Sequence, residues 1–174
     1  CGEKAPAMNP DPNHTHADFA VWVLGTQLDF SDERYMSGLS TDEHTHDEEG
    51  EYLNKYLHLH DHNGSVLHSH KPGLTLGEFF GSLGVELSSG SVTLNQYLFD
   101  QIPATERETY ALSSTLKDSG KFRWQMFVNG EEVPFYPQYA FKDLDKILLT
   151  YDASDTDVHS FDERVTDDAC LYSR

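Results

Sequence analysis

Residues 56–70 hold five of the chain's ten histidines in a segment with the pattern of a β-hairpin. Asn63-Gly64 is its turn signal. A two-residue loop there would place leucines and histidines on one face, whereas the three-residue loop His62-Asn63-Gly64 pairs odd-numbered residues with odd-numbered ones. The odd-numbered leucines then face the core: Leu57, Leu59 and Leu67. The opposite face carries the even-numbered histidines: His58, His60, His68 and His70.

Imidazoles at this spacing suit a transition-metal ion. Side chains on one face of a hairpin lie about 5 Å apart across the strands and about 7 Å apart along them. Neutral imidazole binds Zn²⁺, Cu²⁺ and Ni²⁺, so the ligand type alone does not choose among these ions. We therefore expect this face to bind a divalent transition metal through His58, His60, His68 and His70, with His62 beside them.

A second His-x-His pair precedes a strand predicted to run to Leu24. Side chains alternate along a strand, so His14, His16 and Asp18 share one side. The apolar residues Phe19, Val21 and Val23 take the other side. We expect His14, His16 and Asp18 to be the next candidate ligands. If this strand lies beside the hairpin, they join the same surface.

The third pair, His44 and His46, lies in the polar, acidic segment 31–51, which we predict to be a loop. It could supply further ligands or be a solvated run of charge, the more usual role. The whole chain has 30 acidic and 12 basic side chains and a formal charge of −18. This charge argues against a nucleic-acid partner and favours cations.

The start Cys1-Gly2, followed by a polar, proline-containing stretch to Asn13, resembles a mature bacterial or archaeal lipoprotein. The resemblance implies a tether over residues 1–13, a lipid anchor on Cys1 and an extracytoplasmic location, at the cell surface or in the periplasm. The alternative is a disulfide with Cys170, the other cysteine, which would compete with the lipid for the same sulfur.

Further along, the sequence predicts one short helix. Thr75 to Glu78 has the form of a capping box, and Gly84 ends the pattern. Its apolar face comprises Leu76, Phe79, Phe80 and Leu83. The other expected elements are a strand over Val92–Phe99, a polar insertion over 100–120, a hairpin over Phe122–Val133 that turns at Asn129-Gly130, a strand over Lys146–Tyr151, and an acidic tail over 153–174.

The order of these elements resembles a β-grasp domain. Leu83-Gly84-Val85, Phe127-Val128-Asn129-Gly130 and residues 141–147 are similar to segments of sulfur-carrier and transcobalamin-like domains. The resemblance implies an α+β fold, a β-grasp-like mixed sheet with one short helix packed on its apolar face, as a single domain over 14–152. The terminal Gly-Gly of sulfur carriers is absent from this sequence, so their chemistry does not carry over.

The histidine motifs also resemble a family of small, uncharacterised proteins exported by archaea and bacteria. The matching segments are His14-x-His16-Ala17-Asp18-Phe19, His58-Leu59-His60-Asp61 and His68-x-His70. The resemblance implies export and supplies no activity.

We therefore expect an extracytoplasmic protein that captures, buffers or delivers Zn, Cu or Ni, with membrane contact only through Cys1 and with a protein partner left open. The alternative is a non-enzymatic, pH-responsive interaction module. A second alternative is a mononuclear enzyme that uses two histidines and a carboxylate such as Asp18 or Asp61. The sequence has no nucleophile elbow, phosphate loop or dinucleotide fingerprint, so we assign no catalytic residue and no organic cofactor.

Overall fold

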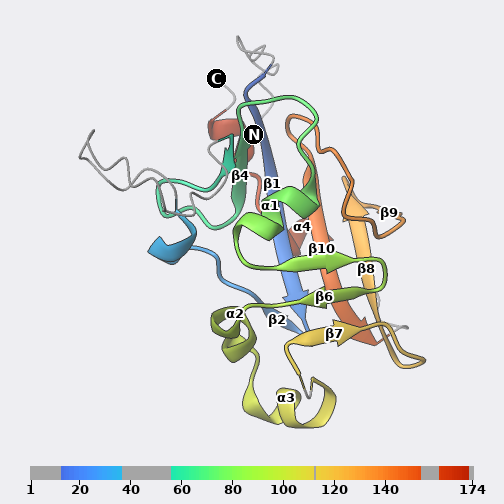
Figure 1. Ribbon diagram of the computed structural model, residues 1–174. Helices are drawn as coiled ribbons and strands as arrows, with labels where there is room; N and C mark the ends of the chain where they lie inside the picture. Colours follow the sequence, from blue (N-terminus) through green and yellow to red (C-terminus); the bar gives the residue numbers. More distant parts are fainter. Residues whose placement is uncertain (1–12, 37–55, 112, 154–160, 173–174) are drawn as a thin grey trace.

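The computed structural model of this chain describes residues 13–36, 56–111, 113–153 and 161–172 (Figure 1). The expectations for Cys1, the tether 1–13 up to residue 12, and the pair His44 and His46 lie outside these ranges. So does most of the acidic segment 31–51, of which the described part holds a 3-10 turn, η1 (Glu33–Tyr35).

A mixed sheet of seven strands forms the main layer. Its order is β3-β4-β1-β10-β8-β9, and β2 pairs with the end of β1. The strands are β1 (Thr15–Val23), β2 (Thr26–Gln27), β3 (Leu57–His58), β4 (Val66–Ser69), β8 (Phe122–Val128), β9 (Glu131–Val133) and β10 (Lys146–Ala153). The central pair, β1 and β10, is parallel, and the flanking pairs are antiparallel. This arrangement confirms the predicted β-grasp-like α+β fold.

Helix α1 (Leu76–Ser82) covers one face of the sheet, as predicted (Figure 1). The side chain of Thr75 accepts a hydrogen bond from Glu78 N, and the Glu78 carboxylate accepts one from Thr75 N, which completes the capping box. Phe79 and Phe80 are buried against Phe19 of β1, with ring centroids 5.1 and 5.8 Å apart. The apolar helix face and the odd-numbered side of β1 thus form one core.

The C-terminal residues cover the other face of the sheet, on the side away from α1 (Figure 1). Helix α4 (Phe161–Arg164) and the 3-10 turn η2 (Ala169–Leu171) belong to this segment. Val165 is buried with Ala20 and Leu148 in a second apolar cluster, and Trp22 Nε1 donates to Arg164 O at 3.2 Å. The acidic composition of the tail did not predict this packing.

An insertion between α1 and β8 forms a separate three-stranded sheet of β5 (Glu86–Ser88), β6 (Ser91–Thr93) and β7 (Thr115–Lys117). Two helices, α2 (Gln96–Gln101) and α3 (Ala104–Tyr110), connect β6 to β7. The strand predicted over Val92–Phe99 is therefore wrong beyond Thr93. Asn95 accepts a hydrogen bond from Leu98 N at 3.0 Å, and this N-cap starts a helix in a segment rich in strand-forming residues.

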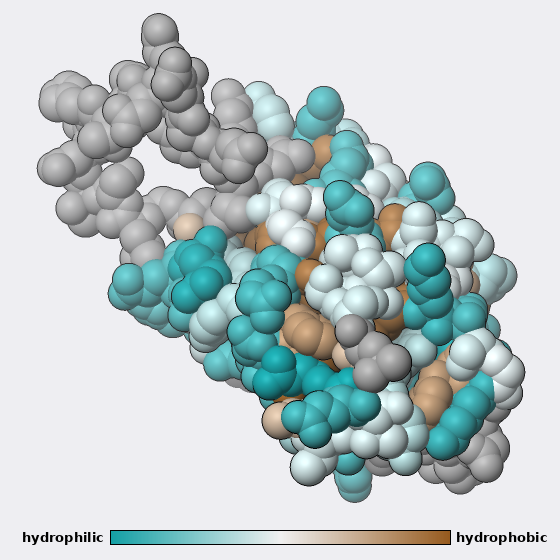
Figure 2. Space-filling view, turned by 60° about the horizontal axis from the view of Figure 1, so that its bottom comes forward, coloured by the Kyte–Doolittle hydropathy of each residue, from teal (hydrophilic) through white to brown (hydrophobic). Residues whose placement is uncertain are grey.

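Figure 2 brings the α2 and α3 end of the molecule forward. On this face hydrophobic side chains appear as small separate areas between hydrophilic ones (Figure 2). The histidines lie at the other end of the molecule, around the start of β1.

Candidate metal centre

The register of three neighbouring strands brings the histidines together. His16 of β1 lies opposite His68 of β4, and His68 lies opposite His58 of β3 on its other side. Leu57 pairs with Ser69, so odd-numbered residues pair with odd-numbered ones, as predicted. The strand that begins beside His14 therefore lies directly next to the hairpin. The sequence had left open whether the two are neighbours.

The turn of the hairpin differs from the predicted one. Asp61 and His62 are the turn residues, with φ values of 59° and 54°, and Asn63 N donates to His60 O at 3.1 Å. Gly64 is not in the left-handed region. Instead it lies so close to the next segment that a Cβ atom would be 2.4 Å from Ser31 N. The loop is longer than expected, but its odd parity keeps leucines and histidines on opposite faces.

Six imidazoles from β1, β3, β4 and their ends form what we call the histidine cluster: His14, His16, His58, His60, His68 and His70. Ring centroids lie 3.7 Å apart for His60 and His68 and 4.8 Å apart for His16 and His68. His70 lies 4.1 Å from His14 and 5.0 Å from His58. The four hairpin histidines predicted to share a face thus meet His14 and His16 on one side of the sheet.

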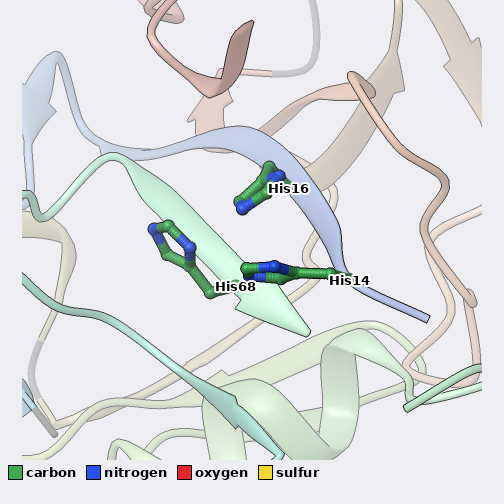
Figure 3. A group of neighbouring side chains, drawn as sticks. All are labelled: His14, His16 and His68. Carbon is green, nitrogen blue, oxygen red and sulfur yellow. The ribbon is translucent and has the colours of Figure 1, made fainter. Parts of the chain in front are cut away.

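Three members of the cluster could hold one metal ion. His14, His16 and His68 each offer a ring nitrogen, and these nitrogens all lie within 4.8 Å of one another (Figure 3). His14 and His16 come from the start of β1, and His68 comes from β4 (Figure 3). In a tetrahedral zinc site with bonds of about 2.0–2.1 Å, ligand nitrogens lie roughly 3.3 Å apart. Small side-chain movements would therefore bring the three nitrogens onto one ion.

Burial keeps two of these imidazoles neutral. The side chains of His16 and His68 are 1% and 0% exposed. Burial, with a smaller effect of the nearby His14, lowers the pKa of His16 to about 4 against the opposing effect of Asp143. Burial and the neighbouring His60 lower the pKa of His68 to about 2. Because a metal binds only the deprotonated imidazole, both side chains have a ligand's protonation state at neutral pH.

Two residues that the sequence did not indicate lie against the cluster. Asp143 Oδ1 accepts a hydrogen bond from His16 N at 2.9 Å and is 3.7 Å from His16 Nδ1. The Tyr172 ring covers the cluster, with its centroid 4.7 Å from that of His68 and 5.8 Å from that of His16. Both come from distant parts of the chain, so no local motif could have identified them.

Asp18 has a different set of partners from those expected of a ligand. Its carboxylate accepts hydrogen bonds from Thr166 Oγ1 at 2.6 Å, Asp168 N at 2.8 Å and Ala169 N at 3.1 Å. Asp18 therefore anchors the C-terminal segment to β1. Cys170 in this segment is disulfide-bonded, and Cys1, the other cysteine, lies outside the described residues.

An open cavity of about 590 Å³ adjoins the cluster. Its lining includes the turn residues 61–65, residues 27–31 and two C-terminal residues, Asp168 and Tyr172. His62 lines this cavity and is not one of the three grouped imidazoles. Asp61 and Tyr172 line the cavity and also contact the cluster, so the cavity lies next to the histidine cluster.

Among the described residues, no helix has both the length and the apolar character needed to cross a membrane. Comparison with known proteins found no matching family model, no matching curated protein and no matching solved structure.

Proposed function

We propose that this protein binds a divalent transition-metal ion through His14, His16 and His68, and that it captures, buffers or delivers this ion outside the cytoplasm. The observation that carries the proposal is the grouping of three imidazole nitrogens within 4.8 Å, with two of the side chains almost fully buried. Burying a neutral imidazole costs free energy when its ring nitrogens have no partner. A bound cation would accept the lone pairs of these nitrogens.

The donor set favours a transition metal over Ca²⁺ or Mg²⁺. Those ions prefer oxygen ligands, whereas Zn²⁺, Cu²⁺ and Ni²⁺ accept imidazole nitrogen. The formal charge of −18 would raise the local concentration of any cation, an effect that salt weakens. Selectivity among the three ions would depend on coordination geometry rather than on ligand type.

A second candidate function is metal-dependent catalysis. Three protein ligands leave one position of a tetrahedral ion for water or substrate, and the cavity of about 590 Å³ lies beside the cluster. A bound ion would supply Lewis acidity or an activated water in that position. We rank this candidate second because the cavity lining identifies no substrate.

Metal titration tests the main proposal. Untagged protein is analysed for metal content, stripped with a chelator and titrated calorimetrically with Zn²⁺, Cu²⁺ and Ni²⁺. We expect one strong site for at least one ion. The double substitution His14→Ala, His68→Ala should remove it, while the control His62→Asn should leave it within about twofold, since Asn tolerates the left-handed backbone at this position.

Wild-type protein that binds these ions no more tightly than an unstructured histidine-rich peptide would end the metal proposal and favour the interaction module. If binding survives loss of His14 and His68 and disappears on loss of His58 and His70, the ion is held on the other side of the cluster.

The extracytoplasmic location is supported by the disulfide bond of Cys170, because disulfides persist in oxidising compartments. The lipid anchor on Cys1 expected from the sequence would compete with this bond for the same sulfur. Intact-mass spectrometry of native protein from its own cells tests the anchor. A lipid-modified Cys1 would support it, and an unmodified or disulfide-bonded Cys1 would reject the anchor.

A further inference from the structure

Three side chains, Asp61, His60 and His68, form a series of hydrogen bonds from the hairpin turn to the buried centre of the histidine cluster. His60 Nδ1 is 2.7 Å from Asp61 Oδ2, and His60 Nε2 is 3.0 Å from His68 Nδ1. The Asp61 side chain is 69% exposed, that of His60 is 28% exposed, and His68 is fully buried. The series therefore leads from a solvated carboxylate to an imidazole without solvent contact.

The chemistry of these contacts determines where the protons lie. An ionised carboxylate only accepts hydrogen bonds, so the proton of a neutral His60 is on Nδ1 and its Nε2 is an acceptor. His68 Nδ1 must then donate to His60 Nε2. A neutral His68 with its proton on Nδ1 has a lone pair on Nε2.

The other ring nitrogen of His68, Nε2, has a lone pair that this series of hydrogen bonds does not use. It is buried and has no hydrogen-bond partner among the residues that the structure describes. A buried acceptor without a partner is destabilising, so folded proteins rarely contain one. A metal ion at this nitrogen would satisfy the lone pair.

We propose that Asp61 and His60 are positioning residues that hold His68 in the tautomer whose Nε2 binds the metal ion. This inference rests on the proposed function and assigns His60 a role that differs from direct ligation. The carboxylate polarises His60, His60 accepts the proton of His68 Nδ1, and the basicity of His68 Nε2 increases. Carboxylate groups that orient metal-binding histidines in this way commonly change metal affinity by 10–100-fold.

The local backbone conformation positions the carboxylate of Asp61. Asp61 and His62 both have left-handed φ values, which makes the chain turn directly after His60. Asn63 Oδ1 accepts a hydrogen bond from Ser65 N at 2.8 Å, and Gly64 lies against the backbone of Phe30 and Ser31. The turn is therefore anchored at its far side, and the Asp61 side chain is directed back to His60.

The test compares the metal-bound wild type with Asp61→Asn, which keeps the size of the side chain and tolerates the left-handed backbone. With the ion that binds wild type, we expect the affinity of Asp61→Asn to fall 10–100-fold. In metal-free His60→Ala, which removes the acceptor of the His68 Nδ1 proton, the ¹⁵N chemical shifts of His68 should change from the Nδ1–H pattern of the wild type toward the other tautomer or a mixture. The matched control is the neighbouring turn substitution His62→Asn, which should change neither quantity.

X-ray absorption of the metal-bound forms separates positioning from ligation. Both His60→Ala and Asp61→Asn should keep the wild-type number of imidazole ligands. Loss of one imidazole in His60→Ala would show that His60 is itself a ligand and would overturn the inference. Wild-type affinity in Asp61→Asn, or an unchanged His68 tautomer in His60→Ala, would also overturn it. Failure of the proposed function is a distinct result, because the wild type would then bind no ion.

Discussion

His68 has its central place because it has a histidine opposite it on both neighbouring strands. His16 lies on one side and His58 on the other, and the resulting crowding leaves His68 without solvent contact. The alternation of leucine and histidine predicted the face on which His68 lies. It did not predict the burial, because this requires β1 beside β4 and the Tyr172 ring above.

The lowered pKa values predict acid-sensitive folding of the metal-free protein. In the unfolded chain both His16 and His68 gain protons below about pH 6.5, whereas the folded state resists protonation until about pH 4 for His16 and about pH 2 for His68. The contribution of these two neutral side chains to the free energy of unfolding is therefore fully present above pH 6.5. It decreases as the pH falls from there toward the lowered pKa values, by up to about 1.4 kcal/mol per pH unit for each side chain.

Urea unfolding of metal-free protein at about pH 7.5 and pH 5.0 measures this effect. His68→Gln should reduce the pH dependence of the unfolding free energy by roughly half of the two-histidine contribution. The pH slope is the informative quantity, because the substitution also changes packing. An identical slope in wild type and His68→Gln would contradict the lowered pKa of His68.

At the scale of elements, the hairpin depends on a close contact of Gly64 that the sequence did not predict. Asn63-Gly64 is a common turn signal. In this chain the glycine is needed because the backbone of Phe30 and Ser31 passes close to it, and the turn forms one step earlier, at Asp61 and His62.

Two glycine substitutions test this distinction. Gly64→Ala should destabilise the protein by about 1–3 kcal/mol, because its Cβ would be 2.4 Å from a backbone atom, and it should weaken metal binding by moving the turn. The matched control is Gly81→Ala in α1, where a Cβ meets nothing within 4 Å and helix propensity should stabilise by about 0.5–1 kcal/mol. Chemical denaturation of both variants provides the measurement, and equal stabilities would disprove the close-contact role of Gly64.

The C-terminal segment is held to the sheet by one buried carboxylate. The Asp18 carboxylate accepts hydrogen bonds from Asp168 N and Ala169 N, and a hydrogen bond to a charged group is worth about 1.5–3 kcal/mol. Asp18→Asn would remove the charge and replace one of the two acceptor oxygens with an NH2 donor. We expect faster amide hydrogen exchange over residues 161–172 and at least a tenfold increase in the rate of metal release to a chelator, because Tyr172 would cover the cluster less of the time. Exchange that stays at the wild-type rate would show that Val165 and Trp22 are sufficient to hold the segment.

At the scale of the whole molecule, the candidate metal ion would join β1 and β4, two neighbouring strands inside the sheet. Ligand that binds only the folded state stabilises it, by about 2.7 kcal/mol at a concentration 100 times the Kd. For a chain of 174 residues this corresponds to a rise in Tm of roughly 5–10 °C. Calorimetry with and without the ion measures the rise, which His14→Ala, His68→Ala should abolish. A rise that persists in this variant would place the ion elsewhere.

The sequence by itself determined which side chains face the core and which carry imidazoles, because side-chain alternation along a strand is a local property. The capping box at Thr75 and the Asn129-Gly130 turn were predictable for the same reason, and they were enough to suggest the β-grasp order. The helix that begins after Asn95 was missed because strand propensity and an N-cap competed in one segment.

Only the tertiary structure decided which imidazoles meet. His14 and His16 are more than fifty residues from His68 in the sequence, and their grouping depends on the pairing of β1 with β4. The packing of the C-terminal segment on β1 likewise gave Asp18 its hydrogen-bond partners, Thr166, Asp168 and Ala169. A local pattern establishes the direction of a side chain, whereas the partner it meets depends on contacts between segments that are distant in the chain.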